Sequence, residues 1–549
     1  LKVDGARESL VWRARPGGEE VVVAADTYVL SPRWVGGWLA WSAPAGDDWP
    51  IFASRPPADA REEPRRPFGL PGRAASLNAA DAADGASWLV WEQRRGRRTQ
   101  VWAARVEADG FGEAVPVSDG AMNAYDPACA VAADGTLYVA YCAFVWGNYH
   151  ILLQALEPDG RTRGAPKRVS IRPSPCLYPS LWPARQGGVW FSYTALCGPA
   201  DDEADLSFVT HLRFRAQRGA FFRRGLVHVG RFDGRQCWAV GAPRGRQGFT
   251  AAGVVRTGLG AGHSHVLEDS RGRLRLLLRQ HAELEEAPYS EADESPACRR
   301  QEGVTRPGTN HADIRIAALG DDDWTKAELL VPRAHVESPV SFVTDGERLV
   351  AAFTEDGRRT GWGRWGEWFD DRGELGVGVC DVRLADAGEP DYDWRPLRLP
   401  PTAGPALANQ PAPRAGDGPL RLALGQTHAH TDLSVCCRED DRDGHFNYRF
   451  MQDVQGCDFG MTADHAYNMW LAEMLWVNKL AAYYYFPGQF VAAPAYEWTG
   501  SGRELDHEGG PFGHVNPLYL EESGELDIYT PCDPSCAGGS LARLWATHR

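Results

Sequence analysis

The sequence predicts a multidomain protein in which an all-β propeller precedes an α/β domain. Three observations support this fold class. Strands and glycine turns recur with a period near 50 over residues 1–399, and residues 400–418 are rich in Pro, Ala and Gly without periodicity. From 419 to 549, apolar runs alternate with helical-looking stretches. We therefore expect a propeller at 1–399, a linker at 400–418 that uncouples the domains, and an α/β domain at 419–549.

Short apolar strands follow glycine-containing turns throughout the first 399 residues. The first four turns, at Gly37, Gly85, Gly135 and Gly188, are spaced 48, 50 and 53 residues apart. Most of these strands are followed by a second one. A period near 50 with paired strands and Asp-Gly turns is typical of a β-propeller. Seven such turns predict about seven blades, with six or five possible, and a repeated β-sandwich is the alternative architecture.

The propeller domain carries its own pair of histidines, His263 and His265. We interpret them as polar residues with ordinary partners at the start of a strand rather than as ligands. A propeller also suits a glycosidase or lyase of the sialidase type. The sequence has no repeated Ser-x-Asp-x-Gly motif and no recognisable acid and nucleophile pair, and the fold alone does not decide the function.

In the C-terminal domain, His428 and His430 stand one residue apart just after the apolar run 420–424. Side chains at i and i+2 of an extended chain point to the same face, so both imidazoles enter one space, as metal ligands do. Three later segments also deliver a histidine or carboxylate: Asp464 and His465 after 459–462, Glu497 after 490–496, and His514. Helical-looking stretches at 447–455 and 469–485 separate them. Strands, ligands and helices in this order predict a barrel with its site at the C-terminal strand ends.

These motifs resemble those of a known superfamily. THAHTD, TADH, the Glu of AYEWTG and the later His514 are similar to the successive motifs of the polymerase-and-histidinol-phosphatase (PHP) superfamily of metal-dependent phosphoesterases. The surrounding RFMQDVQGCDFGMTADHAYN is most similar to a bacterial, PHP-like branch. The resemblance implies a distorted (β/α) barrel that holds two or three divalent metal ions (Zn, Mn or Fe).

The resemblance also implies the ligands. His428 and His430 would bind the first metal, Glu497 would bridge two metals, His514 would serve the second, and His465 the third.

Two acidic residues complete the expected site. Asp443 matches an acidic or histidine ligand that follows the first motif, and Asp441 and His445 compete for that place. Asp464 would orient a neighbouring ligand, so Glu497 and Asp464 are the expected catalytic residues.

The resemblance covers about 130 residues, roughly half of a barrel. The second histidine motif and the Asp-x-His motif of the family do not occur before Arg549. A half barrel would expose a sheet edge and the apolar faces of its helices. We therefore expect a C-terminal continuation or a companion chain to complete the barrel.

Composition excludes some partners. A formal charge of −15 disfavours nucleic acid as the partner, and no run of 18 apolar residues predicts a membrane span. The chain starts at Leu1 without a signal-like stretch, as in a soluble protein that is cytoplasmic or exported after loss of a leader. The twelve cysteines are expected to be buried thiols or, after export, to include one or two disulfides.

Together these features predict a metal-dependent hydrolase that acts on a phosphoester or related bond. Two metals would activate a bridging water and hold the substrate oxygens. The propeller would present or select a small-molecule or glycan-linked substrate. The alternative is a glycan- or protein-binding propeller fused to a degenerate, non-catalytic PHP-like domain.

Overall fold

A computed structural model provides the structure of the chain. It describes residues 2–4, 7–14, 18–25, 28–56, 70–82, 85–171, 175–197, 224–240, 254–255, 261–281, 311–320, 324–325, 327–335, 340–356, 359–360, 369–370, 375–384, 390, 392, 394–397, 422–434, 443–464, 469, 471–499 and 514–519. Below, the β region means the described residues up to 397, and the C-terminal part means those from 422 to 519. The predicted linker at 400–418 lies outside the described residues.

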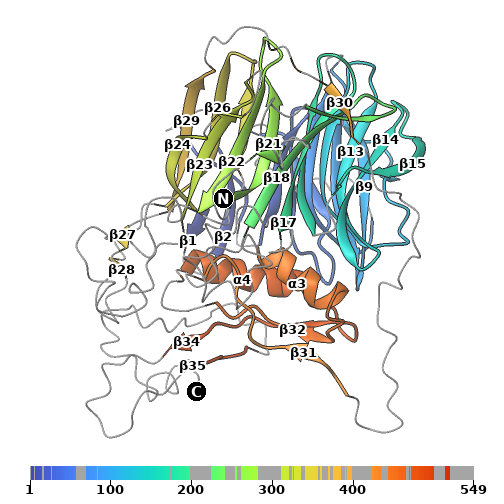
Figure 1. Cartoon of the computed structure of the whole chain (residues 1–549). Coiled ribbons are helices and arrows are strands. Elements are labelled where there is room, and N and C mark those ends of the chain that lie inside the picture. The colour runs from blue at the N-terminus through green and yellow to red at the C-terminus, as the bar shows by residue number, and fades with distance from the viewer. Residues whose placement is uncertain are drawn as a thin grey trace, which may run out of the picture.

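Antiparallel sheets of consecutive strands make up the β region (Figure 1). Two have three strands: β1 (Lys2–Asp4), β2 (Arg7–Trp12) and β3 (Val21–Ala24), then β4 (Leu30–Val35), β5 (Trp38–Ser42) and β6 (Ile51–Ser54). The next has five: β7 (Arg73–Asp81), β8 (Ser87–Arg95), β9 (Arg98–Glu107), β10 (Gly110–Phe111) and β11 (Val115–Pro116). Another has four: β12 (Ala124–Val131), β13 (Leu137–Val145), β14 (Asn148–Leu156) and β15 (Thr162–Arg168).

The later sheets of the β region are larger. One contains β16 (Cys176–Pro183), β17 (Val189–Cys197), β18 (Arg224–Phe232), β19 (Cys237–Val240), β20 (Val254–Val255) and β30 (Trp394–Pro396). Another contains β21 (Ala261–Glu268), β22 (Leu274–His281), β23 (His311–Ala318), β24 (Glu328–His335), β25 (Ser341–Thr344), β26 (Arg348–Asp356) and β29 (Leu375–Arg383). Strands β27 (Arg359–Thr360) and β28 (Phe369–Asp370) pair with each other.

The first strands of five successive sheets adjoin in chain order. Strand β4 contacts β7, β7 contacts β12, β12 contacts β16, and β16 contacts β21. Each of these strands has a register shift at a non-glycine residue with a φ of +46° to +53°: Ser31, Ser76, Asp126, Tyr178 and His263. A bulge that recurs at the same point of each sheet shows that the backbone itself repeats. Sheets arranged in this way are typical of a propeller.

The glycine turns identified in the sequence do not all begin a sheet. Six of the seven join the first two strands of a sheet or, at Gly346, strands β25 and β26. The turn at Gly234, with φ +95°, joins β18 and β19, the third and fourth strands of their sheet. Any tight connection between antiparallel strands favours such a glycine, so a glycine turn does not by itself mark the start of a sheet.

The C-terminal part contains a small parallel sheet with two helices. Its elements are β31 (Gly425–Gln426), α3 (Gly444–Asp453), β32 (Phe459–Gly460), α4 (Leu471–Tyr484) and β33 (Val491–Ala492), and the sheet order is β31-β32-β33. Strands β34 (Trp498–Thr499) and β35 (His514–Val515) pair antiparallel. Neither described helix is long and apolar enough to cross a membrane.

The prediction of a PHP-type (β/α) barrel is wrong. Helices α3 and α4 lie between the small parallel sheet and the ends of the large sheets, whereas barrel helices would form an outer layer (Figure 1). One apolar cluster joins Trp49 and Ala75 of the β region to Tyr483 of α4 and Ala492 of β33. Helix α4, LAEMLWVNKLAAYY, carries apolar residues around its whole circumference, as expected of a helix covered on both sides. The alternation of strands and helices was correctly predicted, but the surface that covers the helices was not.

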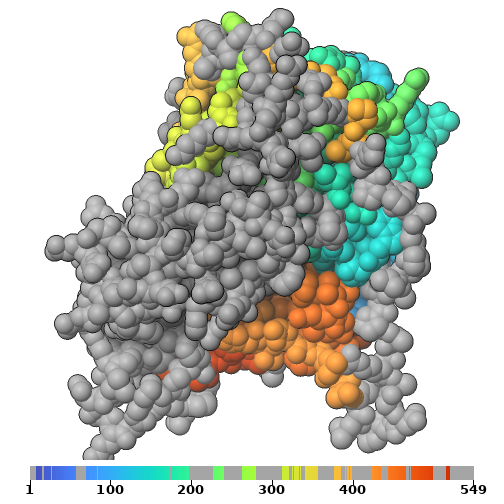
Figure 2. Space-filling model, in the orientation of Figure 1, coloured from blue at the N-terminus to red at the C-terminus, as the bar shows by residue number. Residues whose placement is uncertain are grey.

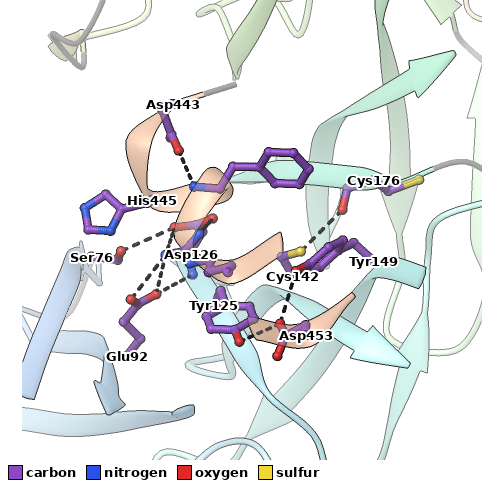
Figure 3. Close-up of polar contacts among 12 residues, drawn as sticks. Ser76, Glu92, Tyr125, Asp126, Cys142, Tyr149, Cys176, Asp443, His445 and Asp453 are labelled. Carbon is purple, nitrogen blue, oxygen red and sulfur yellow. Dashed lines mark hydrogen bonds and ion pairs between the residues drawn. The ribbon is translucent and has the colours of Figure 1, made fainter. Parts of the chain in front are cut away.

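An ion network centred on Arg449 of α3 joins the two parts. Figure 3 shows two of its members from the β region, Glu92 and Asp126. Arg449 Nη1 lies 2.6 Å from Asp126 Oδ2 of β12, and its Nη2 lies 2.9 Å from Glu92 Oε2 of β8. The Arg449 and Glu92 side chains are 3% and 1% exposed, so both charges have left water. Burial raises the pKa of Glu92, and the Arg449 charge opposes that rise. Burial lowers the pKa of Arg449, but Asp126 and Glu92 outweigh this effect and raise it well above its ordinary value.

Further buried contacts hold α3 and α4 on the β region. The carboxylate of Asp453 accepts hydrogen bonds from Tyr125 Oη at 2.7 Å, Tyr149 Oη at 3.1 Å and Asn123 Nδ2 at 2.7 Å. Lys479 Nζ of α4 lies 2.8 Å from Glu8 Oε1 and donates to Val29 O at 3.0 Å. Figure 2 shows the C-terminal part, in orange, directly against the cyan and teal strands. The expectation that the two parts are uncoupled is therefore wrong for the described residues.

The cysteines of the β region and the C-terminal part that the structure describes are free thiols. They are Cys129, Cys142, Cys176, Cys237, Cys380 and Cys457, and all but the half-buried Cys380 are buried. Burial raises the pKa of the Cys237 thiol to about 12. These thiols belong to the apolar core.

Replacing Arg449 should destabilise the folded protein strongly. The Arg449→Met variant leaves Glu92 and Asp126 close together without their cation, and losing one partner of a buried ion group costs about 3–5 kcal/mol. The free energy of unfolding in urea measures this loss. The matched control is Arg163→Met, which breaks the exposed ion pair with Glu157 and should leave stability unchanged. Equal stability of both variants and the wild type would contradict a structural role for Arg449.

His445 should make stability depend on pH. Its Nδ1 lies 3.0 Å from Tyr484 Oη, and burial lowers the pKa of His445 to about 3. The unfolded chain binds a proton at this residue below about pH 6.5 and the folded chain does not, so stability falls as pH drops from 6.5 towards 3. His445→Gln should lose less stability than the wild type between about pH 7 and about pH 5.

The control for this experiment is Tyr484→Phe. It removes the same hydrogen bond but keeps the titrating imidazole, so its stability should fall with pH as steeply as that of the wild type. Other titrating groups act equally in all three proteins and cancel in the comparison. The same pH dependence in His445→Gln would show that His445 does not carry the effect.

Candidate metal centre

The three parallel strands bring their C-terminal ends to one edge of the small sheet. Backbone hydrogen bonds continue beyond the strands: Met461 N donates to Gln426 O at 2.9 Å, Ala463 N to Ala429 O at 2.8 Å, and Glu497 N to Asp464 O at 2.8 Å. The segments that follow β31, β32 and β33 therefore stay side by side. Residues just past the ends of parallel strands share this edge, where ligands commonly bind in α/β sheets.

Two histidines and one glutamate converge at this edge. The distance from His430 Nε2 to Glu497 Oε2 is 2.8 Å, and that from His428 Nε2 to the same oxygen is 3.8 Å. The side chains of His428, His430 and Glu497 are 46%, 13% and 4% exposed. The cluster therefore opens to solvent on the side of His428, with Glu497 at its base.

The three donors suit a divalent metal ion. One ligand atom from each of His428, His430 and Glu497 lies within 4.8 Å of the other two. Metal–nitrogen and metal–oxygen bonds of about 2.0–2.2 Å place neighbouring donors roughly 3–3.5 Å apart, close to the observed distances. Two imidazoles and a carboxylate suit first-row transition metals, and three protein ligands leave room for water. Within the residues that the structure describes, this donor set fits one ion rather than two or three.

Asp464 holds the turn that carries His430. Its Oδ1 accepts from Thr431 N at 2.6 Å and from Ser434 Oγ at 2.7 Å, and its Oδ2 accepts from Thr431 Oγ1 at 2.9 Å. Burial raises the pKa of Asp464, while His430 and these hydrogen bonds act in the opposite direction. Asp464 thus fixes the turn that carries His430, and its role beside a metal ligand stays a prediction.

Asn516 contacts the outer face of His428. The pairing of β34 with β35 brings Asn516 Nδ2 to 2.7 Å from His428 Nδ1 and to 3.3 Å from Thr427 O. With this amide nitrogen as donor, the proton of a neutral His428 sits on Nε2 and faces Glu497. Metal binding at Nε2 requires the other tautomer, in which Nδ1–H donates to the oxygen of the Asn516 amide.

The other expected ligands have different positions. Asp443 caps α3, where its Oδ1 accepts from Phe446 N at 2.6 Å, and it does not belong to the metal cluster. Its competitor His445 points to Tyr484. His465, Asp441 and the side chain of His514 lie outside the described residues. The backbone of His514, in β35, pairs with that of Thr499 in β34.

Sequence reasoning missed Thr431, Ser434 and Asn516. Thr431 follows His430 directly, and a polar residue at the turn of a ligand loop is a signal that could have pointed to it. Asn516 stands two residues after His514 and carries no comparable signal.

The histidine pair of the β region forms no comparable cluster among the described residues. His263 stacks on Tyr178 with ring centroids 3.7 Å apart, and His265 meets Phe342 edge-on at 5.5 Å. Burial lowers the pKa of His265 to about 4. Neither residue joins the group of possible metal ligands.

Comparisons with known proteins do not support the resemblance to the PHP superfamily. No family model matches the chain, and no curated protein matches it. The assignment to that superfamily, with its phosphoesterase activity, zinc and manganese, was therefore wrong. The short HxH, Asp-His and isolated Glu motifs are consistent with strand ends in many folds, which is why they misled.

Several solved structures are similar to parts of the chain. A protein of unknown function from Dyadobacter fermentans is 12% identical, with TM-score 0.35, covering 59% of this chain and 83% of that chain. An ulvan lyase, described as a new family of polysaccharide lyase, is 11% identical, with TM-score 0.38, covering 67% and 81%. An endo-1,4-beta-xylanase from Bacteroides thetaiotaomicron is 14% identical, with TM-score 0.27, covering 55% and 94%. Likenesses at these TM-scores carry no argument about function.

Asp464→Asn should loosen the ligand turn. An amide supplies one acceptor oxygen where the carboxylate supplies two and carries no charge, so the hydrogen bonds to Thr431 and Ser434 weaken, at a cost of about 1–3 kcal/mol. Urea unfolding measures the loss. The control is Asp159→Asn, which alters an exposed carboxylate of the β region. A variant as stable as the wild type would argue against Asp464 as the anchor of this turn.

Proposed function

We propose that the chain binds one divalent metal ion through His428, His430 and Glu497 and hydrolyses a substrate with water activated at that ion. The convergence of three donor atoms within 4.8 Å, from the segments that follow the two outer strands β31 and β33, supports this proposal. Three protein ligands with an open position are the pattern of catalytic rather than structural metal sites.

The arrangement of the residues suggests how the site would work. A bound divalent ion supplies a water of lowered pKa and polarises the bond under attack. Glu497, almost fully buried, provides the negative charge that holds the ion. His428, nearly half exposed, stands where substrate would approach. Asp464 fixes the turn of His430, so that the donors are in place before the ion binds.

For the substrate, we propose a small molecule or a glycan-linked compound. The cluster opens at His428 on the surface, so a group attached to a larger molecule can reach it. A panel of glycan-linked and simple esters is the first screen. Turnover that depends on added metal would support the proposal.

The alternative is a binding protein. The β region would bind a glycan or a protein, and the C-terminal part would be non-catalytic. The use of Asp443 as a helix cap favours this alternative, since a residue expected to bind metal serves the fold instead. Metal content with no metal-dependent turnover on any substrate of the panel would support it.

Changes at the three ligands test metal binding directly. His430→Ala should reduce bound metal from about one ion per chain to nearly none, and His428→Ala should weaken binding, because each removes one of only three protein donors. Glu497→Gln keeps the shape of the side chain but loses the charge, so it should bind weakly and lose turnover. Elemental analysis and Co²⁺ titration measure these effects.

The control is His263→Ala, which alters the other HxH pair and should keep the metal content of the wild type. A wild-type protein that binds no Co²⁺ would overturn the proposed metal site. Unchanged metal content in both His428→Ala and His430→Ala would move the site elsewhere.

A further inference from the structure

We infer that Arg279, on strand β22 of the β region, is a positioning residue for the proposed metal ligand His430. The inference rests on the proposed metal site and deepens it, because it gives the β region a direct part in that site. The link runs from Arg279 to Asp432, two residues after His430. Arg279 Nη2 lies 3.3 Å from Asp432 Oδ2.

The segment 430–434 is a tight turn with its polar groups held from several sides. Ser434 N donates to Thr431 O at 3.1 Å and closes the turn. Asn447 Nδ2 of α3 donates to His430 O at 2.8 Å. Asp464 accepts hydrogen bonds from both Thr431 and Ser434, and Arg279 binds Asp432. The polar residues after His430 are therefore held by other segments of the chain. Small shifts of this turn therefore move the His430 imidazole.

Arg279 is itself rigidly placed. It lies on β22, between β21 and β23, with Gly262 and Ile314 as its backbone neighbours. The Arg279 and Asp432 side chains are 5% and 0% exposed. A buried charge pair tolerates little movement, because separating the charges leaves each of them without compensation in a poorly polarisable interior.

Two further contacts join the sheet of β22 to the C-terminal part, one at the turn after His430 and one at helix α4. Leu433 packs in an apolar cluster with Ala312 of β23 and Val477 of α4. His335 Nε2 of β24 lies 3.0 Å from Glu473 Oε1 of α4. The ion pair of Arg279 thus acts on a turn that is already packed against the sheet, and it orients the turn rather than merely attaching it.

Arg279→Met tests the inference in the full-length chain with Co²⁺ alone as the probe. The variant keeps an apolar stem but leaves Asp432 without this cation, so the turn should shift. Loss of a residue that orients a metal ligand lowers metal affinity about 10- to 100-fold. The visible absorption of bound Co²⁺ should also change, because it reports the ligand geometry. Arg279→Lys should recover part of the affinity.

The matched control is Arg275→Met. Arg275 lies on the same strand and forms a buried ion pair with Asp269 at 3.1 Å, within the β region. This variant should lose stability to a similar degree but keep the affinity and the Co²⁺ spectrum of the wild type. The comparison separates an effect on the site from a general effect on the sheet.

The double variant Arg279→Met with Asp432→Asn decides the case if the single variant does not fold. It removes both charges, so it should regain stability while its Co²⁺ affinity stays low. Wild-type affinity and spectrum in Arg279→Met, or in the double variant, would overturn the role of Arg279 and leave the metal site intact. No Co²⁺ binding by the wild type would overturn the proposed metal site, and this inference with it.

Discussion

The contact of Arg449 with Glu92 and Asp126 is the constraint on which the rest of the structure depends. The guanidinium belongs to α3, and the two carboxylates belong to different sheets of the β region. Each charge would cost several kcal/mol to bury alone, so the three groups must meet in one geometry. That geometry fixes α3 relative to β8 and β12. Because α3 connects β31 to β32, it also fixes the strand ends that carry His428 and Asp464.

A parallel sheet of three two-residue strands is too small to be stable by itself. Here the sheet gains its stability from helices that pack on a much larger partner. Trp49 and Ala75 share an apolar cluster with Tyr483, and Lys479 binds Glu8 in the same interface. The β region thus forms one side of the core that supports the proposed metal site.

Much of the local structure was predictable from the sequence. The strand-helix alternation of the C-terminal part and the antiparallel strands of the β region follow from hydrophobic period and glycine turns. The arrangement around the helices was not predictable in this way, which is why a (β/α) barrel was wrongly expected. The apolar pattern of α4 shows that the helix is buried on all sides, but it does not show which elements cover it. The turn at Gly234 illustrates the same limit. Its sequence is like that of the other turns, yet it joins the third and fourth strands of a sheet rather than the first two.

At the site, the sequence by itself determined that His428 and His430 share a face, because side chains two residues apart in an extended chain point the same way. It also placed Glu497 after an apolar run, but the position of that run in the sheet, with β32 between it and β31, follows only from the fold. Only the tertiary structure decided that Asp443 caps a helix, that Asn516 contacts His428, and that Arg279 holds the turn after His430. Local geometry acts over a few residues and is encoded in each segment. Partners such as Arg279 and Asp432 are 153 positions apart, and their meeting depends on how the whole chain buries its apolar surface.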